Sequence, residues 1–158
     1  MIVDTAYDIQ AHLLSGDGEY APNYIFVEYK NVENLNEEIA DESLATDTIE
    51  HYSKLSTYDS DCDYLAIPIT IKPRIVEPTG DSHTAIEYSV VTSGITHGVN
   101  GLPFSTDNNS VIYSLGLVTR IHNRHSDTDI LFARTSFDDE HQMIKTTSDM
   151  YITWKVEL

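Results

Sequence analysis

The second half of the chain alternates apolar and polar residues with the period of two that is typical of half-buried β-strands. In the final segment, Ile152, Trp154 and Val156 share one face, and Thr153 and Lys155 occupy the other. Strand-like segments lie at 24–29, 64–73, 83–92, 110–121, 130–137 and 150–158. We therefore predict about six strands, the last of which ties the C-terminal segment into a sheet.

Two of these segments contain a residue that interrupts a regular strand. Pro68 lies inside 64–73, and because proline has no backbone N–H to donate, this segment is expected at a sheet edge or at a bulge. Gly116 lies inside 110–121, where it predicts a bulge or a close approach of another backbone.

Helical patterns are confined to the first third of the chain. Residues 6–14 form a short amphipathic segment that ends at Gly16, and Asn34 followed by Glu37 is typical of a helix start. Residues 48–55 fit either element, because one helical face is apolar but the β-branched residues favour a strand. We predict one or two short helices here.

The elements point to one mainly β domain over residues 1–158. Evenly spaced strands after a short helical region favour an antiparallel β-sandwich, with a jelly-roll strand order as one variant. Residues 31–63 are read as an acidic, partly helical excursion. The Gly-rich stretch 93–110 is too long for a tight hairpin, so we interpret it as an exposed functional or interface loop; a disordered connection is the alternative.

Charge excludes two classes of partner. The net charge is −17, and residues 1–65 hold fifteen of the 26 acidic residues against two lysines. Such a surface repels nucleic-acid phosphates and anionic lipids, so we expect neither partner.

No apolar run approaches eighteen residues, which predicts no membrane span. Cys62 is the only cysteine, so the chain forms no internal disulfide.

Two groups of residues are candidates for binding a metal. Asp59, Asp61 and Asp63 alternate as oxygen ligands of Ca²⁺ do, but the Gly and Glu of an EF-hand loop are missing, and a solvated acidic turn is the alternative. His122 and His125 stand three apart near further acidic residues, as Zn²⁺ ligands can, but a hairpin tip does not hold ligands rigidly and no fourth ligand is obvious, so a polar turn is the preferred interpretation. We predict no metal at either.

No pattern in the chain indicates catalysis. The Gly-x-Ser-x-Gly elbow, the phosphate loop and the dinucleotide fingerprint are all missing from the sequence. No carboxylate pair stands out among the 26 acidic residues. We therefore expect neither an enzyme nor a bound cofactor.

Trp154 is assigned to the core, whereas Tyr58, Tyr64 and Phe104 are the aromatic residues that a carbohydrate-binding surface would use.

Residue patterns at both ends resemble a known group of proteins. Tyr20-Ala21-Pro22 leads into an apolar strand, and Leu131-Phe132-Ala133-Arg134 is followed by Lys145-Thr146 and then by Trp154. These features are similar to the opening and the closing strands of small structural proteins of tailed bacterial or archaeal viruses. Where that group continues into a Gly-rich segment, this chain has the polar residues 28–31.

The resemblance implies a role without enzymatic activity. It implies a virion component, associated with the tail, the neck or the capsid, that binds copies of itself and other virion proteins. A homo-oligomer is expected, because symmetry multiplies weak contacts. The alternative is a carbohydrate- or receptor-binding module of a viral fibre.

Overall fold

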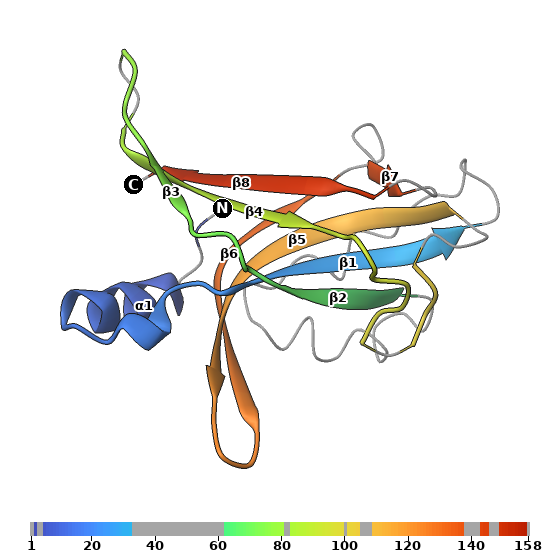
Figure 1. Cartoon of the computed structure of the whole chain (residues 1–158), viewed down its shortest axis with the longest axis horizontal. Coiled ribbons are helices and arrows are strands. Elements are labelled where there is room, and N and C mark those ends of the chain that lie inside the picture. The colour runs from blue at the N-terminus through green and yellow to red at the C-terminus, as the bar shows by residue number, and fades with distance from the viewer. Residues whose placement is uncertain are drawn as a thin grey trace.

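The computed structural model describes residues 2, 5–32, 62–80, 83–99, 101–104, 109–137, 143–145 and 149–157. Its elements are α1 (Thr5–Leu14), a 3-10 turn (Gly18–Tyr20), β1 (Tyr24–Val32), β2 (Cys62–Pro68), β3 (Arg74–Val76), β4 (Ala85–Val91), β5 (Asn109–His122), β6 (Asp127–Ser136), β7 (Met143–Lys145) and β8 (Tyr151–Glu157). The mainly β fold and the short N-terminal helix are as predicted (Figure 1).

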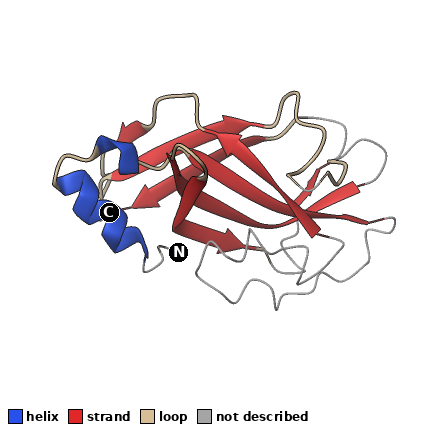
Figure 2. Cartoon of the chain, turned by 90° about the horizontal axis from the view of Figure 1, so that it is seen from below, coloured by secondary structure: helices blue, strands red, loops and turns tan. Residues whose placement is uncertain are grey.

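The strands form two antiparallel sheets in a β-sandwich-like arrangement. The larger sheet has the order β2-β1-β5-β6, with β7 paired to β5, and the smaller has the order β3-β4-β8. Every strand pairing that the structure describes is antiparallel. Figure 2 shows α1 and the 3-10 turn at one end of the strands.

Alternate residues from both sheets build the main core. The larger sheet contributes Ile25 and Val27 of β1, and the smaller contributes Val90 of β4 and Ile152 of β8, all at most 5% exposed. The buried face of the helix contributes two further apolar residues, Ala6 and Ile9. The period-two pattern therefore reflects packing between the sheets. Among the described residues, neither helical segment has the length and apolarity needed to cross a membrane.

Two bulges interrupt the pairing of β5 with its neighbours, one with β1 and the other with β6. Tyr113 of β5 is skipped between the pairs Glu28–Ser114 and Tyr29–Ile112. Phe132 of β6 is skipped opposite the step from Leu117 to Val118. Each extra residue increases the local twist. Beyond the second bulge the β5–β6 hairpin leaves the sheet as a projecting arm (Figure 1).

The structure tests the predictions made for Pro68 and Gly116. Pro68 is the last residue of β2, which is an edge strand, so the edge prediction is confirmed. Gly116 is itself in regular register, opposite Phe26 and Arg134, so the bulge prediction was wrong in position. A glycine permits a bulge but does not compel one, and the register shifts lie at Glu28/Tyr29 and Leu117/Val118.

Some predictions fall outside the described structure, and two strands were missed. The helix start at Asn34, the segment 48–55 and most of the excursion 31–63 lie outside the described residues. The strands β3 and β7 were not predicted, since each has only three residues, too few to show a period.

Candidate functional site

An apolar groove lies between α1 and the smaller sheet. Its volume is about 480 Å³. The helix lines it with Gln10, Leu13 and Leu14, and its other walls are Ile2, Pro22, Ile86, Tyr88, Phe132 and Glu157. Leu14 is 90% exposed, and Ile2 is 39% exposed. Because these apolar side chains lie side by side around one hollow, they form the kind of contiguous apolar patch that often marks an interaction site.

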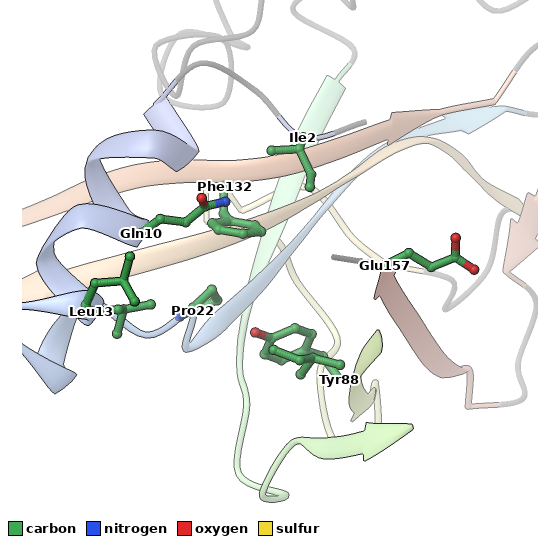
Figure 3. A pocket seen from close by; sticks show the side chains of 9 residues that line it. Ile2, Gln10, Leu13, Pro22, Tyr88, Phe132 and Glu157 are labelled. Atoms are coloured by element: carbon green, nitrogen blue, oxygen red, sulfur yellow. The ribbon is translucent and has the colours of Figure 1, made fainter. Parts of the chain in front are cut away.

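Two aromatic rings from different sheets face this groove. Figure 3 shows the ring of Phe132, from the bulge of β6, and the ring of Tyr88, from β4, on opposite sides of the hollow. Burial raises the pKa of Tyr88 above its ordinary value, so its hydroxyl stays a neutral hydrogen-bond donor. Glu157 lies at the rim with its carboxylate directed away from the rings (Figure 3). The groove can therefore hold an apolar group and hydrogen-bond its polar end.

A second cluster joins β1, β2 and the loop 93–104. The Tyr29 hydroxyl donates a hydrogen bond to the Leu102 carbonyl. One Asp63 carboxylate oxygen accepts the Leu102 N–H at 2.9 Å, and the other accepts the Tyr64 N–H at 2.7 Å. Both Tyr29 and Asp63 are fully buried. These bonds satisfy buried polar groups and fix the loop on the sheet.

The loop is thus anchored to the sheet, while most of its described residues are exposed, as predicted for 93–110. Phe104 is 1% exposed and lies edge-on to the Tyr29 ring, with 4.8 Å between the ring centroids. Val99 donates its N–H to the Tyr64 carbonyl at 2.8 Å, which ties the loop to β2. Val99 itself remains 55% exposed. The loop therefore buries its aromatic residue, while exposed residues run along its described length from Ser93 to Pro103.

Because the Tyr29 hydroxyl is buried in this cluster, we expect the protein to lose stability at alkaline pH. Burial, and then the charge of Asp63, raise the pKa of Tyr29 well above its ordinary value. In the unfolded chain a tyrosine loses its proton near pH 10, about where stability begins to fall. Above that pH the unfolded state binds fewer protons, so the free energy of unfolding decreases by about 1.4 kcal/mol per pH unit for this group.

Denaturant unfolding between pH 9 and 12 measures this slope. We expect Tyr29→Phe to have a shallower slope than the native chain, since the variant has no proton to lose at this position. Tyr7→Phe is the matched control, because Tyr7 is 68% exposed on α1. Equal slopes for the native chain and Tyr29→Phe would contradict the assignment.

The acidic metal candidates do not form a described site. Asp59 and Asp61 lie outside the described residues. Asp63 is buried and directed at the backbone of the loop, so it acts as a structural hydrogen-bond acceptor. In the part of the chain that the structure describes, no three His, Cys, Asp or Glu side chains group closely enough to hold a metal ion.

The histidine candidates lie at the tip of the projecting β5–β6 hairpin. His122 Nδ1 is 3.0 Å from a carboxylate oxygen of Asp127 across the hairpin, and both side chains are exposed. His125 is exposed in the turn between the strands. The structure therefore does not bring the two histidines together with further ligands among the described residues.

The base of the same hairpin carries a partly buried ion pair. The Arg120 guanidinium donates to the two carboxylate oxygens of Asp129 at 2.7 and 3.1 Å. Its central carbon lies 4.6 Å from the centroid of the Tyr24 ring. The hydrogen bonds to Asp129 raise the pKa of Arg120, so the pair stays charged. This fork-shaped pair joins the two strands of the arm two residues from the His122–Asp127 pair, with the guanidinium over the Tyr24 ring of β1.

A polar row also joins β1 to β5. The Ser114 hydroxyl donates to a carboxylate oxygen of Glu28 at 3.0 Å, and the Ser110 hydroxyl donates to the Asn31 side chain at 2.7 Å. Glu28 and both serines are fully buried. These bonds run between neighbouring strands, so they stabilise the strand pairing.

Two of the three aromatic candidates for a carbohydrate surface, Tyr64 and Phe104, already pack against other residues of the protein. Phe104 belongs to the core, and Tyr64 is half-buried, with its ring stacked on Phe26 at a centroid distance of 5.3 Å. Tyr58 lies outside the described residues. The assignment of Trp154 to the core face of its strand is confirmed, because it packs against the main core between Ile152 and Val156.

Sequence reasoning did not find the groove. Its walls come from the N-terminal segment, α1, β4, β6 and β8, which are far apart along the chain. Only one signal pointed to it, namely the apolar pair Leu13 and Leu14 at the end of a short helix.

Compared with known proteins, the chain matches no protein-family model, no curated protein and no solved structure.

Proposed function

We propose that this chain is a non-enzymatic structural component of a tailed virus particle that binds copies of itself and neighbouring particle proteins. Two observations support the proposal. The residue patterns at both ends resemble small structural proteins of such particles, and the fold is a β-sandwich-like module with an open apolar groove.

The groove is the observation that carries the proposal. It offers an apolar hollow of about 480 Å³ whose most exposed side chain, Leu14, is 90% accessible. A neighbouring protein that inserts an apolar side chain would cover Leu14 and pack against Phe132 and Tyr88. Burying one such side chain contributes about 1.5–3 kcal/mol.

Charge indicates the chemistry of the neighbouring protein. The chain has a net charge of −17, and Glu157 lies at the rim of the groove. A partner segment with an apolar anchor and a lysine or arginine beside it would complement both features. Such a partner would associate faster at low ionic strength, since the attraction between unlike charges is screened by salt.

Mass spectrometry of purified particles, separated into head and tail fractions, tests the proposal. We expect the chain in intact particles and in one of the two fractions. Its absence from every fraction of particles that encode it would contradict the proposal.

The role of the groove is tested in the same particles by Leu14→Gln. This change keeps helix propensity and leaves the core intact, and we expect about tenfold less incorporation. Ala11→Gln is the matched control, because Ala11 is exposed on the same helix and does not line the groove. Equal incorporation of the two variants would show that the groove does not dock a partner.

A further inference from the structure

The edges of the two sheets are protected to very different degrees. An unprotected edge presents unpaired N–H and C=O groups that bind another strand, so soluble proteins cover, shorten or bend their edge strands. Three edges of this sandwich show such protection. The fourth, β8, shows no such protection from the residues that the structure describes.

The protected edges use different devices. On β2, the Tyr64 carbonyl accepts the Val99 N–H of the covering loop. On β3, the strand has only three residues and directly follows Pro73. On β6, the bulge at Phe132 breaks the register, and Thr5 donates its hydroxyl hydrogen to the Leu131 carbonyl.

β8 is long and regular, and its outer edge pairs with no other strand among the described residues. Ile2, which bridges to Ala133 of β6, lines a hollow with residues 154–157 of β8 without pairing to them. Within the described part of the chain it pairs only with β4, through seven consecutive residue pairs without a register shift. It contains no proline and no glycine. Its core-facing residues are Ile152, Trp154 and Val156, so no inward charge opposes the addition of a strand.

A hollow beside this strand is also open. It has a volume of about 430 Å³ and is lined by Leu115 of β5, Thr135 of β6, Phe137 and residues 151–155 of β8. Phe137 and Trp154 are only partly buried. A strand added to β8 would extend the smaller sheet on this side and bring further apolar side chains to the hollow.

We propose that β8 pairs with β8 of a second copy of this chain, in antiparallel register centred on Trp154. This inference rests on the self-association in the proposed function and assigns it to one surface. The two smaller sheets then join into one six-stranded sheet across a two-fold axis. The pairing is isologous, so each copy contributes the same edge.

The sequence of β8 is complementary to itself in this register. Ile152 lies opposite Val156 of the partner subunit on the core face, and Thr153 lies opposite Lys155 of the partner subunit on the outer face. Tyr151 lies opposite Glu157 of the partner subunit, so all seven residues are paired and no like charges meet.

Other registers fit less well. Centring the pair on Lys155 sets two lysines directly opposite each other, which is destabilising. Centring it on Thr153 leaves Val156 and Glu157 without partners within β8. A shift by one residue would place core-facing residues of one copy opposite outer residues of the other.

Disulfide trapping tests the register. Two proteins are made on a Cys62→Ser background, one with Thr153→Cys and the other with Lys155→Cys. Opposite residues of antiparallel strands have Cα atoms about 4.5–5.5 Å apart, within the range that a disulfide spans. We expect the mixture to form a covalent dimer on mild oxidation, and each protein alone to form much less.

The matched control replaces Thr153→Cys by Ser89→Cys. Ser89 lies opposite Thr153 on β4, so it shares the outer face but is one strand from the edge. Cross-linking of the Thr153–Lys155 mixture no better than that of the Ser89–Lys155 mixture would overturn the register.

Charge reversal gives a second test that does not depend on cross-linking. Thr153→Lys places two lysines opposite each other at two symmetric positions, and we expect the dimer dissociation constant to rise about tenfold. Adding Lys155→Glu restores unlike pairs and should return it to within about threefold of the native value. Ser89→Lys, with the same charge change away from the edge, should leave it unchanged.

Sedimentation velocity measures these constants, and circular dichroism verifies that each variant is folded. A native chain that is monomeric at about 100 µM, or a Thr153→Lys variant that dimerises as the native chain does, would overturn the inference. A native chain that is monomeric in solution but present in particles rejects this edge alone. A trapped dimer with the chain absent from particles rejects the proposed function alone.

Discussion

Phe104→Ala is expected to lower the free energy of unfolding by about 3–5 kcal/mol, although the residue lies in a loop between strands. Its side chain is 1% exposed and packs edge-on to the Tyr29 ring. Its N–H donates to the Thr96 carbonyl at 2.8 Å, so the loop returns on itself as it enters the core. Truncation would leave a cavity next to Tyr29 and release the anchored loop.

Equilibrium unfolding in urea measures this effect as a shift of the midpoint at constant slope. Phe104→Leu retains most of the apolar volume and should cost clearly less than the alanine variant. Val99→Ala is the control in the same loop, because Val99 is 55% exposed, and it should change the free energy of unfolding by under about 0.5 kcal/mol. Equal effects of Phe104→Ala and Val99→Ala would show that the loop is not anchored by its aromatic residue.

Gly98→Ala is expected to be nearly as severe, with a loss of about 2–4 kcal/mol. A Cβ atom at this position would lie 2.4 Å from a carboxylate oxygen of Asp63 and 2.6 Å from the Tyr29 hydroxyl oxygen. Both neighbours are buried and hydrogen-bonded to Leu102, so neither can move without breaking a bond. The loop can approach the sheet this closely only with glycine at residue 98.

Gly18→Ala is the matched control for this substitution. A Cβ atom there meets no atom within 4 Å, and the backbone does not require glycine. Thermal unfolding should therefore separate the two variants, with a melting temperature near the native value for Gly18→Ala and a much lower one for Gly98→Ala. Similar melting temperatures for the two variants would contradict the close packing around Asp63.

Some features of the fold could be predicted from the sequence, and others could not. The strands could be predicted, because Ile152, Trp154 and Val156 alternate regularly and one face of each sheet packs on the other. The short strands could not, since three residues show no period. Gly116 was a weak guide to the bulges because the register shifts arise from how neighbouring strands fit, which one segment does not encode.

The buried polar cluster was out of reach for a related reason. Asp63 is one of three alternating acidic residues, and the pattern suggested a metal-binding or solvated turn. Its actual role depends on Leu102, which is 39 residues away along the chain. The Gly-rich composition around Gly98 correctly indicated an exposed loop, but it did not show that this glycine serves the close approach to Asp63 and Tyr29. A local pattern gives the kind of residue but not its contacts.

The two surfaces that we propose for association could not be predicted from the sequence either. The apolar groove joins the N-terminal segment to three strands, and the open edge of β8 is recognised only by comparison with the three protected edges. On this account Leu14 docks a neighbouring protein, while β8 joins two copies of the chain. The two surfaces can be disrupted separately, because Leu14 and Thr153 lie on different elements.

Absolute quantification of the chain in purified particles, with isotope-labelled peptides as standards, tests the central claim most directly. A structural component that self-associates should occur at a fixed ratio to a major particle protein, in independent preparations and after washing at high salt. The account predicts such a constant ratio. A trace amount that varies between preparations and is removed by the wash would contradict it.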